Sequence, residues 1–275
     1  THFADERVEI ITALRSFHGR TLKTLAATGQ PDKQLPFQPL PSGFKHVKFN
    51  DISALRQSVD NNTAAVMLEV IQGEGGVYPA EQDYLKEVRR FCDEHQLLLI
   101  LDEVQTGFGR TGKIFAFQHY GIEPDIISVA KGLGNGLPIG AFIAKKSIAD
   151  IFNYGDHGST FGGGPVVCAG ALATLTALTD EKLPEKAAKT GAYFKQKLNE
   201  LAAADTIITD VRGNGLMLGL EIAKQTAPEI VIAMLEQGFI INNIGKNILR
   251  FLPPLTIAEK HIDSMLSALT TFLKD

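Results

Sequence analysis

The chain has 275 residues, of which 44% are hydrophobic and 21% charged, and this composition is typical of a globular protein with room for two domains. The formal net charge of −4 gives no reason to expect nucleic acid or an anionic membrane as a partner. No apolar run approaches the roughly 20 residues of a membrane span. The two cysteines, Cys92 and Cys168, lack metal-ligand spacing, so we expect reduced thiols, no metal and a cytoplasmic location.

The first part of the chain predicts alternating strands and helices. Strands are expected at residues 8–13, 46–49, 64–71, 97–101, 125–130 and 139–144. Helices are expected at 22–27, 52–59 and 79–95, and Asp51 is placed to cap the second of them. Four prolines within 31–43 predict a surface loop. This alternation indicates an α/β fold with a mostly parallel, doubly wound sheet.

After Gly164 and Pro165 the pattern changes to long helices and glycine-rich strands. Helices are predicted at 169–178, 186–203, 227–237 and 257–273. A strand interrupted by glycines is expected at 210–222, and a hairpin at 239–244 and 248–252. We therefore expect a large domain over residues 1–180 and a smaller α+β domain over 181–275.

Reactive residues follow two of the predicted buried strands. The run 97–101 ends on Asp102, and the run 125–130 is followed by Lys131. Ligands of open α/β sheets bind at the carboxyl ends of the strands. An amine beside a carboxylate suits pyridoxal 5′-phosphate (PLP), which needs a Schiff-base amine and a partner for its pyridinium nitrogen.

Motifs along the whole chain resemble those of the class III PLP-dependent aminotransferases. In the family's order they are Ser16-Phe-His-Gly-Arg-Thr21, Ala27-Thr-Gly-Gln30, Gly43-Phe-Lys-His-Val47, Gln72-Gly-Glu-Gly-Gly76, Asp102-Glu-Val-Gln-Thr-Gly107, Ala130-Lys-Gly-Leu133, His157-Gly-Ser-Thr-Phe-Gly-Gly163, Val211-Arg-Gly213 and Leu249-Arg-Phe-Leu-Pro-Pro254. The resemblance implies PLP-dependent transferase fold type I and a homodimer. It also implies roughly another third of chain ahead of Thr1, including a Ser-Gly-Thr-Glu-Ala phosphate loop, so the sequence resembles a truncated enzyme.

The same resemblance implies which residues hold the cofactor. They are Phe17, Asp102, Glu103, Val104, Gln105, Lys131 and Thr160. Lys131 would be the catalytic residue, bonding PLP and moving the substrate proton. Asp102 would pair with the pyridinium nitrogen and Gln105 with the phenolic oxygen, while Phe17 stacks on the ring.

Substrate contacts are implied for four further positions. Arg20 resembles a clamp for a substrate carboxylate, because a guanidinium matches its fork geometry. Glu74 and Arg250 resemble a switching pair that lets one site accept two different amino donors. Ser159 would lie near the substrate, and Thr160 would bind the PLP phosphate of the partner subunit.

Two segments favour one branch of the family. Ala27-Thr-Gly-Gln30 and Pro39-Leu-Pro-Ser-Gly-Phe-Lys-His-Val47 point to transfer of the δ-amino group of N2-acetylornithine to 2-oxoglutarate. The products would be the semialdehyde and glutamate, a step of arginine biosynthesis. Succinylornithine, ornithine or another ω-amine remain alternatives, as does an inactive fragment without PLP. Gly164 and Val70 stand where the family commonly has Asn and Pro.

Overall fold

The computed structural model describes residues 7–273 of the chain, and these form two compact units. Unit 2 consists of Glu74–Pro79, Phe108–Phe115 and the described residues from Ala177 onward. Unit 1 consists of the other described residues. The sequence predicts one domain boundary near residue 180. Unit 2 also includes two short segments from earlier in the chain, which a single boundary does not assign to it.

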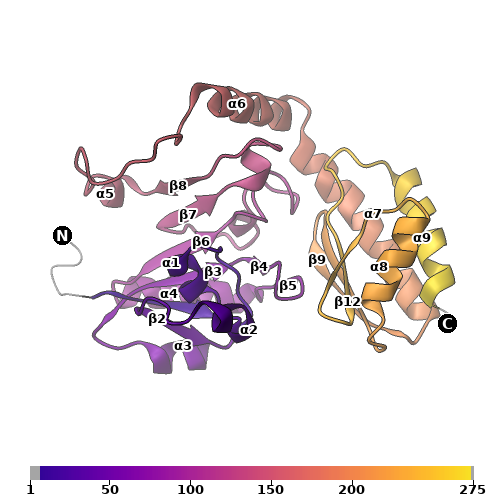
Figure 1. Ribbon diagram of the computed structural model, residues 1–275, viewed down its shortest axis with the longest axis horizontal. Coiled ribbons are helices and arrows are strands. Elements are labelled where there is room, and N and C mark those ends of the chain that lie inside the picture. Colours follow the sequence, from indigo (N-terminus) through magenta and orange to yellow (C-terminus); the bar gives the residue numbers. More distant parts are fainter. Residues whose placement is uncertain (1–6, 274–275) are drawn as a thin grey trace. The chain divides into compact units, whose positions relative to one another are not determined.

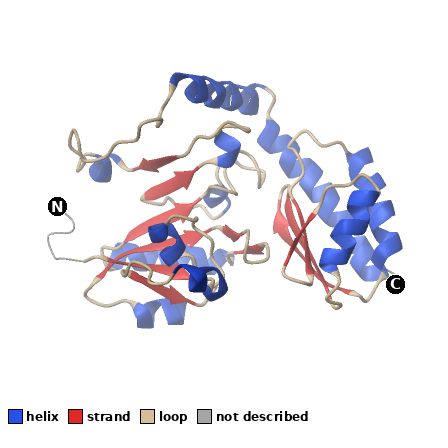
Figure 2. Ribbon diagram, viewed as in Figure 1, coloured by secondary structure: helices blue, strands red, loops and turns tan. Residues whose placement is uncertain are grey.

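Unit 1 is built on a sheet that, among the described residues, has six strands in the order β2-β1-β3-β6-β7-β8 (Figures 1 and 2). Its strands are β1 (Glu9–Ala13), β2 (Phe44–Val47), β3 (Thr63–Glu69), β6 (Leu98–Asp102), β7 (Ile126–Val129) and β8 (Ala141–Ala144). All neighbouring pairs are parallel except β7 and β8, which are antiparallel. The mostly parallel sheet predicted from the alternation of strands and helices is therefore confirmed.

The helices of unit 1 lie largely where the sequence predicted them. They are α1 (Leu22–Ala27), α2 (Pro31–Gln34), α3 (Ile52–Ser58), α4 (Gln82–Glu94), α5 (Lys146–Ala149) and α6 (Pro165–Asp180), which continues into unit 2, with the short 3-10 turns η1 (Leu35–Phe37), η2 (Ala116–His119) and η3 (Lys131–Leu133). The Asp51 cap is confirmed, because its Oδ1 accepts a hydrogen bond from the Ala54 backbone at 2.9 Å. The predicted loop at 31–43 is wrong at its start, since Pro31 suits the first turn of a helix and begins α2.

The central strands β3 and β6 explain why the site lies at one edge of this sheet. Val66, Leu68, Leu99 and Leu101 are all fully buried, as expected for parallel strands covered on both faces. Each strand ends on a carboxylate, and the carboxyl ends of parallel strands meet at one edge. The short strand β4 (Ile71–Gln72) follows β3 directly.

Unit 2 contains an antiparallel sheet in the order β11-β12-β10-β9 and three helices (Figure 1). Its elements are β5 (Tyr78–Pro79), α7 (Leu183–Ala204), β9 (Ile208–Asn214), β10 (Met217–Ile222), α8 (Ala227–Glu236), β11 (Asn242–Ile244), β12 (Ile248–Phe251) and α9 (Glu259–Leu273). The hairpin predicted at 239–252 is confirmed. The single strand predicted over 210–222 is wrong, because Gly213 and Gly215 adopt positive φ and the chain turns back as β9 and β10.

One face of this antiparallel sheet packs against the helices. Leu218, Leu220, Leu249 and Phe251 point to that side and form a core with Phe194 of α7 and residues of α8 and α9. Alternate residues of a strand point to opposite faces. The opposite face therefore carries the residues that alternate with these, among them Gly219 of β10 and Arg250 of β12. None of the described helices in either unit is long and apolar enough to cross a membrane.

We predict that Gly191→Ala destabilises unit 2. A methyl group at Gly191 in α7 would lie 2.2 Å from the carbonyl oxygen of Gly215. Gly→Ala inside a helix ordinarily stabilises by about 1 kcal/mol, but this overlap should reverse the sign and cost about 1–3 kcal/mol. Chemical denaturation measures it, with Lys189→Ala on the exposed side of α7 as control. A gain in stability for Gly191→Ala would contradict the packing.

Candidate active site

A cavity of about 220 Å³ lies at the carboxyl ends of β3, β6 and β7. Its walls come from these strand ends and from the segment after β1, and the lining residues are Phe17, His18, Gly19, Glu69, Ile71, Asp102, Val104, Gln105 and Lys131. Lys131 begins η3 with φ +45°, a left-handed conformation that is uncommon outside glycine. Strain of this kind is often found at functional sites.

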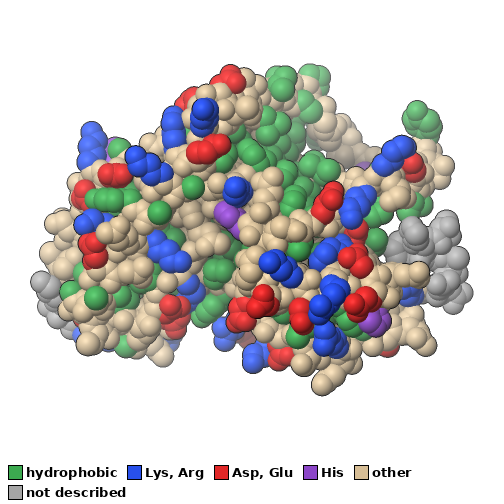
Figure 3. All heavy atoms as spheres, turned by 180° about the vertical axis from the view of Figure 1, so that it is seen from behind, with side chains coloured by type: hydrophobic (Ala, Val, Ile, Leu, Met, Phe, Trp, Pro, Cys, Tyr) green, Lys and Arg blue, Asp and Glu red, His purple; other side chains and the backbone are tan. Residues whose placement is uncertain are grey.

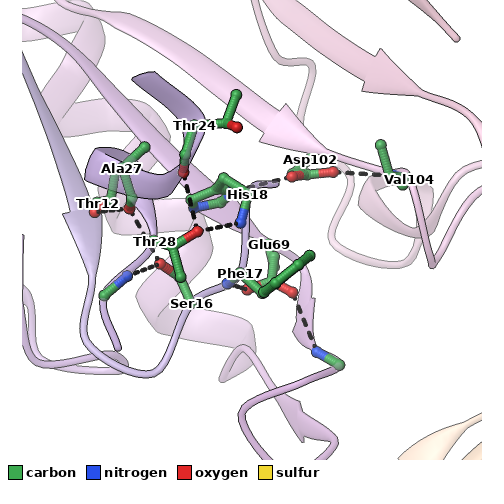
Figure 4. Close-up of polar contacts among 12 residues, drawn as sticks. Thr12, Ser16, Phe17, His18, Thr24, Ala27, Thr28, Glu69, Asp102 and Val104 are labelled. Atoms are coloured by element: carbon green, nitrogen blue, oxygen red, sulfur yellow. Dashed lines mark hydrogen bonds and ion pairs between the residues drawn. The ribbon is translucent and has the colours of Figure 1, made fainter. Parts of the chain in front are cut away.

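Asp102 is a buried carboxylate with two hydrogen-bond partners, as Figure 4 shows. Its Oδ1 accepts from the Val104 backbone at 3.1 Å, and its Oδ2 lies 2.9 Å from Nδ1 of His18. A carboxylate facing Nδ1 favours the proton on that nitrogen. Asp102 is only 5% exposed, so these two bonds supply the polar contacts that a buried carboxylate needs.

The segment that carries Phe17 and His18 is fixed by buried hydroxyl groups (Figure 4). The His18 backbone donates to Oγ1 of Thr28 at 2.9 Å. The Gly29 backbone donates to Oγ of Ser16 at 3.0 Å. These bonds hold the half-buried Phe17 at the cavity wall.

Glu69 connects the segment after β1 with the segment after β4. Its Oε2 accepts from the Phe17 backbone at 3.0 Å and its Oε1 accepts from the Gly73 backbone at 3.2 Å. Burial raises the pKa of Glu69 to about 7; the nearby Asp102 adds to the rise and His18 opposes it. Glu69 is the register partner of Asp102 on the neighbouring strand, so two buried carboxyl groups lie side by side.

Gln105 and Glu103 follow Asp102 but occupy different surroundings. Gln105 lines the cavity, and its side chain fits because Gly73 has no Cβ, which would lie 2.5 Å from Oε1. Glu103 is fully buried and is not among the lining residues. Its carboxylate accepts a short hydrogen bond from Oγ1 of Thr106 and one of 2.9 Å from the Phe117 backbone. Burial raises the pKa of Glu103. Its side chain stabilises the chain that follows β6 by bonding Thr106 and Phe117.

Three of the other expected site residues do not line this cavity. Arg20 is exposed, and its guanidinium carbon lies 5.4 Å from the centre of the Phe17 ring. Ser159 and Thr160 are exposed in the loop before α6. The Gly162 backbone donates to Oγ of Ser159 at 3.1 Å, within the loop itself.

Glu74 and Arg250 both lie in unit 2, where they form an ion pair. Nη1 of Arg250 is 2.7 Å from Oε1 of Glu74, and Nε of Arg250 donates to Oδ1 of Asn242 at 3.0 Å. The structure brings the two charges together. Their role as a switch stays a prediction.

Sequence reasoning missed His18 and Glu69 as parts of the site. His18 stands inside the motif Ser16-Phe-His-Gly-Arg-Thr21, but the motif alone predicts no role for it. Glu69 ends a buried strand next to the strand that ends on Asp102. Its position at the carboxyl end of a strand therefore makes Glu69 predictable on the same ground as Asp102.

Comparison with known proteins places these features in a family. The model of the class-III aminotransferases matches residues 1–273. The chain is 51% identical to the acetylornithine aminotransferase of Methanocaldococcus jannaschii over 95% of its own length and 65% of that protein. It is 50% identical to the acetylornithine aminotransferase of Caldanaerobacter subterraneus over 99% of its own length and 69% of that protein.

A solved structure gives the same result at the level of the fold. The ornithine aminotransferase of Toxoplasma gondii matches with a TM-score of 0.92 and 34% identity, over 98% of this chain and 65% of that one. This chain therefore spans about two thirds of the length of the relatives it matches. With the family model matching nearly every residue, the chain belongs to the class III aminotransferases.

Proposed function

We propose that this chain belongs to a PLP-dependent enzyme that transfers the δ-amino group of N2-acetylornithine to 2-oxoglutarate in arginine biosynthesis, giving the semialdehyde and glutamate. The observation that carries the proposal is the grouping of Lys131, Asp102 and Phe17 around one cavity at the strand ends. The choice of substrate rests on the relatives of about 50% identity, which are named acetylornithine aminotransferases.

The lining of the cavity fits the ring of PLP. It offers an amine, an aromatic side chain, an amide and a buried carboxylate already oriented by His18. The volume of about 220 Å³ lies below the range of about 300–1,000 Å³ typical of whole ligand sites, so the described residues enclose a ring-sized group. When bound, PLP supplies an electron-poor ring that stabilises negative charge at the substrate carbon.

Each of these side chains then has a separate task. Lys131 holds the cofactor through its amine and moves the proton at the reacting carbon. Asp102 keeps a proton on the ring nitrogen, because a nearby negative charge stabilises the protonated, positively charged form of a nitrogen base. His18 keeps the Asp102 carboxylate in place through its 2.9 Å contact. Phe17 and Gln105 orient the ring.

The Glu74–Arg250 pair would let one site use two amino donors. Glutamate brings an α-carboxylate next to its reacting amine, and a free Arg250 would bind it. Acetylornithine has no carboxylate next to its δ-amine, so Glu74 would then neutralise Arg250. The 2.7 Å contact between the two side chains supports this proposal, because it is the contact that the second state requires.

Exposed hydrophobic residues of unit 1 support a homodimer. Several large apolar side chains are solvent-exposed near β8, α5 and α6, and Figure 3 shows hydrophobic side chains gathered on this part of the surface. They include Phe142, Ile143, Phe152, Phe161 and Leu172. Large exposed apolar patches are typical of interfaces. The exposed loop with Ser159 and Thr160 would then contribute to the partner's site. The unpaired Cys92 and Cys168 fit a cytoplasmic enzyme.

We predict that Lys131→Ala abolishes both turnover and the visible absorption band of lysine-bound PLP. The alanine has no amine with which to hold the cofactor or move the proton. Lys146→Ala is the control, because Lys146 is an exposed lysine of α5 and should leave the band unchanged. Spectra recorded during PLP titration give the result. Substantial turnover by Lys131→Ala would show that another group does this chemistry.

Asp102→Asn should slow transamination by about 10²–10⁴-fold, the range in which a positioned proton-transfer group contributes. Asparagine preserves the shape of the side chain but cannot hold a proton on the ring nitrogen by charge. Single-turnover rates measure the loss, with Asp32→Asn in the exposed first turn of α2 as the matched control. A loss below tenfold would mean that Asp102 is mainly a structural residue.

Arg250→Ala should damage the glutamate half-reaction far more than the acetylornithine half-reaction. A hydrogen bond to a charged group contributes about 1.5–3 kcal/mol, so the glutamate half-reaction should slow on the order of 10–100-fold. Glu74→Gln should show the reverse preference. Rapid-mixing absorption spectroscopy separates the two half-reactions. Equal losses in both would rule out a switch.

A further inference from the structure

We propose that Arg212 of β9 is a positioning residue for the Glu74–Arg250 pair, because it fixes segment 74–79 on the sheet of unit 2. The inference rests on the proposed function for its account of what that pair does. Its structural basis lies entirely within unit 2, in the register of three strands and the contacts of one buried arginine.

Three strands place Arg212 and Arg250 on the same face of the sheet. Gly219 of β10 is the register partner of Arg212 on one side and of Arg250 on the other. Directly opposed residues of antiparallel strands point to the same face. The neighbouring Leu218 and Leu220 point to the helices, so the two arginines lie on the other face with a glycine between them.

Segment 74–79 covers the gap that Gly219 leaves between the arginines. A Cβ on Gly219 would lie 3.0 Å from Cβ of Val77 and 3.5 Å from the carbonyl oxygen of Gly76. Val77 is fully buried and has φ +56°. A β-branched residue in the left-handed region is a true outlier, and it persists only when its surroundings hold it.

Arg212 supplies that restraint through two contacts with the segment. Its Nε donates to the carbonyl oxygen of Gly76 at 2.9 Å. Its guanidinium carbon lies 4.0 Å from the centre of the Tyr78 ring, which is a close cation–π contact. Arg212 therefore contacts the residues immediately before and after the strained Val77, which are Gly76 and Tyr78.

Carboxylates of the sheet hold Arg212 in turn. Its Nη1 lies 2.6 Å from Oδ2 of Asp210 and 2.6 Å from Oε2 of Glu221. The Tyr78 hydroxyl also donates to Glu221, at 3.4 Å. Arg212 is only 8% exposed, so the guanidinium plane has little freedom to turn. The planar fork is needed here because it bonds the sheet and the segment at once.

The position of Glu74 depends on these contacts of Arg212, since Glu74 lies two residues before Gly76. If the segment shifts, Glu74 no longer neutralises Arg250, and acetylornithine then meets an uncovered positive charge. Glutamate, which uses Arg250 directly, loses little. Loss of Arg212 should therefore change the choice of amino donor, whereas a merely structural arginine would affect both half-reactions alike.

The test is Arg212→Lys in the enzyme with PLP bound. Lysine keeps the charge but loses the fork and the planar contact with Tyr78. The rate of the acetylornithine half-reaction relative to glutamate should fall on the order of tenfold, the loss that one charge-assisted hydrogen bond produces. Lys195→Met is the control, because Lys195 also bonds a backbone carbonyl of this sheet, that of Gly213. Its ratio should not change.

Two further measurements separate positioning from stability. In the double variant Arg212→Lys/Glu74→Gln the ratio should fall no further than in Glu74→Gln alone, because both changes remove one interaction. Amide hydrogen exchange of residues 74–78, measured without cofactor, should be about tenfold faster in Arg212→Lys, since the restraint on the segment is weakened.

The outcomes distinguish the two levels of the proposal. If Glu74→Gln and Arg250→Ala shift the ratio but Arg212→Lys does not, the positioning role is wrong and the switch stands. If none of the three shifts it, the switch itself fails and the role of Arg212 fails with it. Equal losses in both half-reactions for Arg212→Lys, or unchanged exchange of residues 74–78, would also overturn the positioning role.

Discussion

Two buried carboxyl groups at the ends of neighbouring parallel strands govern the structure of the site. Glu69 and Asp102 are register partners, and neither can be buried without hydrogen-bond donors. The backbones of Phe17 and Gly73 serve Glu69, while His18 and the Val104 backbone serve Asp102. Three of these donors, Phe17, His18 and Val104, line the cavity. The hydrogen bonds that allow the two carboxyl groups to be buried therefore also shape most of the cavity wall.

The strand ends were predictable from sequence because a single rule determines them. Buried parallel strands are continuous apolar runs, and the first polar residue after such a run lies at the sheet edge. That rule located Asp102 and Lys131, and the structure has both in the cavity lining. The Glu74–Arg250 contact followed from the resemblance alone, since 176 residues separate the two and no periodicity links them.

The features that sequence reasoning missed depend on contacts between distant parts of the chain. Nothing local distinguishes the buried His18 from a surface histidine, because only the fold brings it to Asp102, 84 residues later. Arg212 stands in the motif Val211-Arg-Gly213, yet its contacts with segment 74–79 depend on the register of β9 against β10. The turn between those two strands is missed for a local reason. Glycines within an apolar run fit either an interrupted strand or a reversal, and only their positive φ shows that the chain turns back.

Two glycines show how an absent side chain makes a specific contact possible. Gly73 leaves room for the Gln105 amide in unit 1, and Gly219 leaves room for Val77 in unit 2. In each case a neighbouring segment comes close to backbone that any larger residue would cover. The two contacts serve different purposes, because the first shapes the cavity of Lys131 and the second supports the pair that would select the amino donor. Glu74 and Arg250 belong to a separately packed unit. If they select the amino donor as we propose, substitutions in unit 2 should alter donor preference while the lining residues of unit 1 keep their own hydrogen bonds.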